Sequence, residues 1–165
     1  MATTLRTALF ILLFALILQM QYNIDADKTA TRQLKNALEL AVHDATLAIN
    51  TDSVVEGKVI FDRDLAIENL KNSLEASLNV KSEGGYVYTP NKDSFFQDDL
   101  YLVHLEFLDE SVNTTFPLNY INPDYEILET INGPSIVAVL TTESPRWFHG
   151  KTTFIRQAAV YEYKK

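Results

Sequence analysis

The sequence contains no cysteine, only five glycines, five prolines and three histidines in 165 residues. The absence of cysteine excludes disulfide bonds, thiolate zinc sites and thiol nucleophiles. The histidines do not occur in HExxH or another ligand spacing, and no Walker loop, G-x-G-x-x-G or G-x-S-x-G motif is present. The sequence therefore predicts no catalytic residue, cofactor or metal site and no small-molecule substrate, and we expect that the protein is not an enzyme.

Positive charge is also scarce. Lys and Arg total 14 against 22 Asp and Glu, which gives a formal net charge of −8. Proteins that bind nucleic acid need surplus Lys and Arg facing the phosphates, but only Lys164 and Lys165 form a basic pair here. The composition therefore argues against nucleic acid as a partner.

The sequence is rich in apolar residues near its N-terminus. Residues 8–18 are uninterrupted apolar side chains, and residues 7–22 carry no charge. Since a membrane span usually needs about 20 residues, a signal-peptide core or a pilin stalk competes with a transmembrane helix. Residues 19–22 offer no small-x-small cleavage site, so we expect the segment to be retained. The predicted membrane or assembly side chains are Leu9, Phe10, Ile11, Leu12, Leu13, Phe14, Leu16, Ile17 and Leu18.

The charges that flank this segment predict its orientation. Arg6 precedes it, whereas Asp25 and Asp27 are the first charges that follow it. Positively charged flanks remain on the cytoplasmic side of a membrane. We therefore expect a single-pass membrane protein whose C-terminal part lies outside the cytoplasm.

Residues 25–50 contain neither Pro nor Gly, and their apolar residues recur every three or four positions. This period predicts an amphipathic helix that continues the apolar segment from about residue 4 to residue 50, a rod of roughly 70 Å. Ala37, Ala41 and Ala45 give one face of this helix small side chains. Two alternatives follow: the alanines face the domain's own sheet, or they form an interface between subunits.

After a break at residues 51–53 we expect a short extended piece over 54–61 and then a second helix. Asp62 is suited to cap that helix. Its apolar stripe should face the core and consists of Leu65, Ile67, Leu70, Leu74 and Leu78.

The remainder has the alternating pattern of strands. We predict strands at residues 86–88, 101–107, 125–131, 136–140 and 152–163, with 136–140 apolar enough to be central. Residues 144–150 would close a hairpin whose aromatic residues, Trp147 and Phe148, either anchor an interface or pack under the sheet's own edge. The predicted fold is α+β, with a mainly antiparallel sheet of about four to five strands.

The chain therefore divides into a membrane segment (1–22), a continuous helical stalk (23–50) and an extracytoplasmic α+β domain (51–165). This layout resembles that of TadE-like pseudopilins, or minor pilins, of bacterial tight-adherence and related pilus systems. The resemblance lies in residues 34–48 and in the hairpin at 145–150 leading into 155–160. The glutamate expected near the start of the apolar segment and a glycine-ended prepilin cleavage site are missing.

The resemblance implies a structural subunit in a bacterial cell membrane. Its partners would be the membrane and copies of itself or other pilin-like subunits, and it could enter a surface filament. The alternative is a membrane-tethered ectodomain that does not polymerise and that binds another envelope protein or a ligand.

Overall fold

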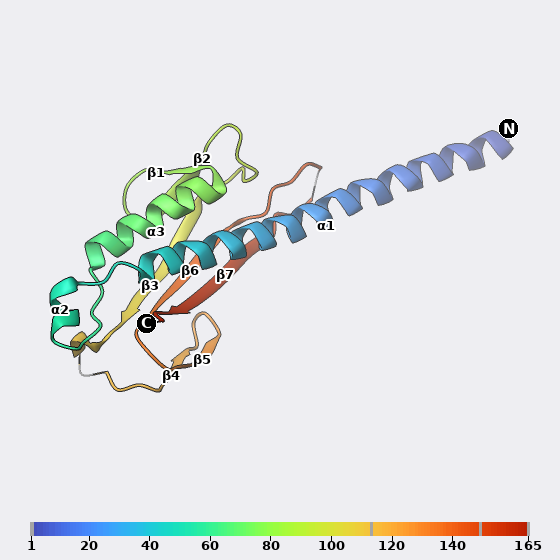
Figure 1. The fold of residues 1–165 in the computed structure, drawn as a ribbon. Coiled ribbons are helices and arrows are strands. Elements are labelled where there is room, and N and C mark those ends of the chain that lie inside the picture. Colours follow the sequence, from blue (N-terminus) through green and yellow to red (C-terminus); the bar gives the residue numbers. More distant parts are fainter. Residues whose placement is uncertain (1, 113, 149, 165) are drawn as a thin grey trace.

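A single long helix connects the N-terminus to the domain in the computed structural model, which describes residues 2–112, 114–148 and 150–164. Helix α1 (Ala2–Thr46) has 45 residues and is therefore about 68 Å long. Its first half projects away from the rest of the molecule, and its second half lies across the sheet (Figure 1). The predicted continuous helix is confirmed, although it ends at Thr46 rather than Asn50.

The segment that follows α1 differs from its prediction. Residues 51–55 form the short helix α2 (Thr51–Val55) instead of a break and an extended piece. The side chain of Asn50 caps α2 by accepting a hydrogen bond from the Asp52 amide at 2.9 Å, and the Ser53 hydroxyl donates to the Asn50 carbonyl at 2.7 Å. Extended pairing is limited to the single bridge between Ile49 and Phe61.

Helix α3 (Arg63–Leu78) confirms the predicted second helix and its cap. The Asp62 carboxylate accepts a hydrogen bond from the Leu65 amide at 3.2 Å. Asn79 ends the helix in the left-handed conformation that favours Asn and Gly, with φ 52°. Leu65 is exposed and Ile67 is only partly buried, so the buried stripe differs from the prediction and consists of Ala66, Leu70, Leu74 and Leu78.

The sheet is antiparallel, as predicted. Its five strands have the order β1-β2-β3-β6-β7, and a separate two-stranded sheet pairs β4 with β5. A 3₁₀ turn, η1 (Glu110–Val112), follows β3. The strands are β1 (Val80–Ser82), β2 (Val87–Pro90), β3 (Leu100–Leu108), β4 (Leu118–Asn122), β5 (Ile127–Ile131), β6 (Ser135–Glu143) and β7 (Phe154–Glu162).

Strand β6 separates two layers of core. Helices α1 and α3 cover one face of the sheet, and the β4–β5 hairpin lies against the other (Figure 1). Because successive side chains of a strand point to opposite faces, Ile136 and Leu140 pack toward the helices, whereas Val137 and Val139 pack toward the hairpin. Both faces of β6 are therefore buried, which explains its continuous apolar sequence.

A small polar network attaches the β4–β5 hairpin to β3. The Tyr120 hydroxyl donates to Glu106 Oε2 at 2.6 Å, and His104 Nε2 lies 3.0 Å from the same hydroxyl. Burial, together with the hydrogen bond to Glu106, raises the pKa of Tyr120 to about 12. The hydroxyl is therefore a donor to Glu106 at neutral pH.

Removing this hydroxyl tests the network. We expect Tyr120→Phe to lower the free energy of unfolding by about 1–2 kcal/mol, because Glu106 and His104 lose a partner in a partly buried site. The measurement is urea unfolding followed by circular dichroism. Tyr101→Phe, an exposed position on β3, is the matched control and should change stability little; equal effects of the two substitutions would contradict the role of the network.

Candidate functional site

The first half of α1 presents an apolar surface that the domain does not cover. Helix α1 contains a segment that is long and apolar enough to cross a membrane, and that segment is not buried by any part of the chain that the structure describes. The predicted membrane side chains are exposed over 37% (Leu18) to 68% (Phe10) of their surface. They are Leu9, Phe10, Ile11, Leu12, Leu13, Phe14, Leu16, Ile17 and Leu18.

The energy of leaving this surface in water is large. Transferring one Leu, Ile or Phe side chain from water to an apolar environment is worth about 1.5–3 kcal/mol, so these side chains together represent more than about 10 kcal/mol. That exceeds the cost that a soluble monomer normally bears on its surface. The exposed apolar half of α1 is therefore compatible with a membrane-spanning segment.

The uncharged part of α1 is somewhat shorter than the core of a bilayer. Residues 7–22 follow Arg6 and are 16 helical residues, which extend over about 24 Å, whereas the hydrocarbon core of a bilayer is about 30 Å thick. Tyr22 stands at the end of this stretch, and Asn23 and Asp25 begin the polar sequence. Burial against the domain starts four residues after Tyr22, at Ala26.

The β6–β7 hairpin reaches back to α1 at this level. The Arg146 guanidinium forms an ion pair with Asp27, and it also donates to the Lys151 carbonyl at 2.9 Å and to the Thr153 hydroxyl at 2.6 Å. The ring of Phe148 lies 5.8 Å from that of Tyr22. We call the contacts Tyr22–Phe148 and Asp27–Arg146 the junction, because they fix the hairpin tip to the helix where its apolar half ends.

The ion pair lowers the pKa of Asp27. Burial alone raises this pKa, but hydrogen bonds from Arg146 and Ser144 and the charge of Arg146 outweigh burial, so the pKa lies below its ordinary value of 3.8. A carboxylate whose pKa is lowered by folding stabilises the attachment above its unfolded pKa. That contribution disappears as the pH falls through the folded-state pKa.

Replacing Arg146 with Gln should have the same effect as protonating Asp27, because either change removes the ion pair. In detergent solution at neutral pH we expect Arg146→Gln to lower the fluorescence anisotropy of Trp147, the only tryptophan, because the hairpin tip is released from α1. The unmodified protein should show the same decrease only when the pH falls below about 3.8. Arg156→Gln, which removes the exposed pair with Glu126, is the control. Unchanged anisotropy in Arg146→Gln would show that the pair does not hold the tip.

The structure separates the other predicted interface residues into two groups. Ala37, Ala41 and Ala45 are buried in the domain's own core, where they pack with α3 and the sheet. Their position therefore agrees with the alternative in which the alanines face the domain itself. Trp147 and Phe148 are exposed over 58% and 38% of their surface at the hairpin tip. The two aromatic residues therefore remain available for contacts outside the domain.

The titratable side chains elsewhere among the described residues form no metal-binding cluster. Among residues 2–112, 114–148 and 150–164, no group of three or more His, Asp or Glu side chains is placed to hold a metal ion. His43 lies 3.2 Å from Asp44 and contacts the ring of Tyr161 by its edge. His149 and Lys165 lie outside the described residues.

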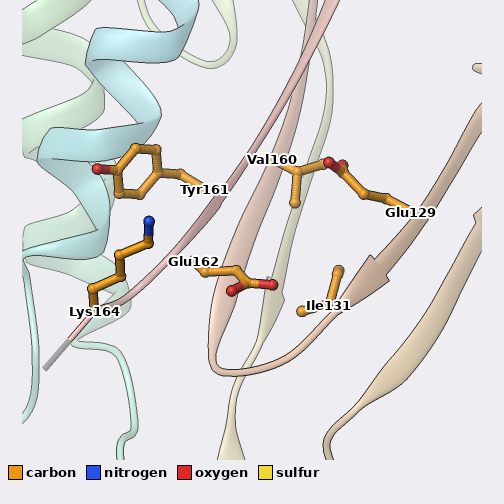
Figure 2. A pocket seen from close by; sticks show the side chains of 6 residues that line it. All are labelled: Glu129, Ile131, Val160, Tyr161, Glu162 and Lys164. Carbon is orange, nitrogen blue, oxygen red and sulfur yellow. The ribbon is translucent and has the colours of Figure 1, made fainter.

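A shallow pocket of about 230 Å³ beside β7 is smaller than the 300–1,000 Å³ of typical ligand sites. Tyr161 and Lys164 lie on one side of β7, whereas Val160 and Glu129 lie on the other, so the lining residues do not converge (Figure 2). Glu162 accepts a hydrogen bond from the Asn132 amide at 2.7 Å and so holds the end of β7 to the turn before β6. The pocket is therefore a shallow groove on the surface whose side chains do not converge on a ligand.

No family model, characterised protein or solved structure matches this chain. The exposed half of α1 and the junction, both joined directly to the domain, are the features of the described residues that bear on function.

Proposed function

We propose that the protein is a membrane-anchored, pilin-like structural subunit that performs no catalysis. The first half of α1 lies in a bacterial cell membrane and can pack with other such helices, while the α+β domain faces outward. The observation that carries this proposal is the continuity of α1, which is one helix from its exposed apolar half to its buried half.

Continuity gives the subunit a mechanical connection. Leu34, Leu38 and Val42 are fully buried in the core of the domain, and no Gly or Pro interrupts the helix before them. A force on the apolar half is therefore transmitted directly to the domain, since a helix without a kink residue bends little. An assembly subunit requires this property, whereas a passive tether does not.

The distribution of the apolar side chains is compatible with both lipid and a helix bundle. Successive positions from Leu9 to Phe14 are all apolar and exposed, so the helix is apolar around its whole circumference. Lipid can cover such a helix, and a bundle of identical helices can replace the lipid without exposing a polar face. A non-polymerising tethered ectodomain would need only the first of these environments.

Cross-linking of single-cysteine variants distinguishes the two. Because the chain has no cysteine, Leu13→Cys provides one thiol inside the apolar half. We expect oxidation of intact cells to give covalent dimers or higher species through residue 13, since neighbouring helices place these thiols within reach. Leu128→Cys, on the exposed face of β5, is the control and should remain monomeric. Absence of cross-links at residue 13 and at other positions of the apolar half would favour the tethered ectodomain.

A further inference from the structure

The tip of the β6–β7 hairpin exposes two large aromatic side chains, Trp147 and Phe148, to solvent. Trp147 and Phe148 are exposed although the rest of the chain provides large buried cores for aromatic side chains. Phe148 lies beside the end of the apolar half of α1, where its ring contacts that of Tyr22, and Trp147 precedes it in the sequence. The exposed aromatics therefore belong to the same end of the molecule as the apolar helix.

The junction fixes the depth of the tip relative to the helix. The Asp27–Arg146 ion pair and the contact with Tyr22 hold the tip at the level of residues 22–27. When the uncharged residues 7–22 lie in the hydrocarbon core, this level coincides with the lipid headgroups. The tip is therefore positioned at the boundary between hydrocarbon and water.

A groove runs between α1 and the tip. Its volume is about 450 Å³, and its lining mixes apolar and polar side chains, including Gln19, Ile24 and Asp27 of α1. Leu16 and Met20 lie at the end nearer the N-terminus, whereas Asn23, Arg146 and Lys151 lie at the other. The oxygen Oδ1 of Asn23 is buried and has no hydrogen-bond partner among the residues that the structure describes.

We propose that the hairpin tip inserts into the headgroup region of the bilayer that holds α1, and that the groove receives a phospholipid there. The inference rests on the anchoring part of the proposed function. An acyl chain lies along Leu16 and Met20, and the phosphate lies near Lys151. The domain is thereby fixed in one orientation on the membrane surface instead of swivelling about α1.

The chemistry of the tip favours lipid over a second copy of the chain. Trp and Tyr, which combine an apolar ring with a polar group, concentrate at the boundary between membrane and water, and Lys extends its ammonium toward the phosphates. The Arg146 guanidinium neutralises Asp27, which would otherwise repel phosphate at this level.

The single tryptophan makes the proposal directly measurable. The full chain is reconstituted at low protein-to-lipid ratio into vesicles of phosphatidylcholine and phosphatidylglycerol, and lipids carry a spin label at the headgroup or near the end of the acyl chain. We expect the headgroup label to quench Trp147 at least about twofold more than the deep label. In the double variant Trp147→Phe, Leu128→Trp, which moves the tryptophan to the exposed face of β5, neither label should quench.

The same samples separate failure of the inference from failure of the anchor. If the protein floats with the vesicles but Trp147 is not quenched by either label, the inference is overturned and the anchor stands. If the protein does not float with the vesicles, both are overturned. Protection of Trp147 that grows with the protein-to-lipid ratio, without quenching by lipid labels, would assign the tip to contact between copies and overturn the lipid proposal.

Discussion

Replacing Leu12 and Phe14 together with Asp should release the protein from membranes. Each Asp near the centre of a membrane helix costs about 3 kcal/mol on insertion scales, so the pair costs about 6 kcal/mol. Both side chains are exposed and belong to the half of α1 that precedes the domain, so the fold of the domain should be unchanged. Flotation of carbonate-washed membranes measures the distribution, and circular dichroism checks the fold.

Leu40→Asp is the matched control for this substitution. Leu40 lies on the same helix and is about half exposed, but it belongs to the half that crosses the domain outside the proposed membrane. The control should stay in the membrane fraction. Retention of the Leu12→Asp, Phe14→Asp variant in the membrane would show that something other than the apolar half of α1 holds the protein there.

Shortening Leu38 to Ala should lower the free energy of unfolding of the domain by several kcal/mol. Leu38 is fully buried where the second half of α1 meets the core, and Leu→Ala at such sites costs about 2–5 kcal/mol because a cavity remains. Small domains have only about 5–15 kcal/mol of stability in total, so much of it would be lost. Urea unfolding of the full chain in detergent, followed by circular dichroism, gives the change directly.

Leu40→Ala provides the comparison on the same helix. It removes the same atoms two residues further along, at a position about half exposed, and should change the free energy of unfolding by less than about 0.5 kcal/mol. Equal stabilities of the Leu38 and Leu40 variants would mean that α1 is not part of the core. The helix could then not transmit force from the membrane to the domain.

Much of the fold was predictable because it depends on strong periodic patterns. The unbroken helix follows from the absence of Pro and Gly, and the central position of β6 follows from the apolar run at residues 136–140. The cap at Asp62 was predictable from local chemistry. In each case the residues that determine the element lie within it or next to it.

The missed elements depend on partners that are distant or on a single side chain. Strand β1 has only three residues, and its pairing with β2 makes it a strand. Strand β4 was not among the predicted strands, and its pairing with β5 and the burial of Tyr120 stabilise it. Helix α2 depends on the Asn50 cap, which resembles an ordinary helix end in the sequence.

The candidate site was predictable only in its apolar part. The membrane side chains follow from composition, and the aromatics of the tip were identified as an interface or a covered edge. The junction was not predictable, because Asp27 and Arg146 are 119 residues apart and neither occurs in a motif. Ala37, Ala41 and Ala45 could not be assigned from the sequence, since small side chains suit the domain's own core and a helix bundle equally.

We propose that the apolar half of α1 stays on the protein and holds it in the membrane. The most direct test is the intact mass of the protein recovered from carbonate-washed membranes of the cells that produce it. Our account predicts a membrane-bound polypeptide that still contains residues 8–22. A mature polypeptide that begins after Tyr22 and is recovered in the soluble fraction would contradict it.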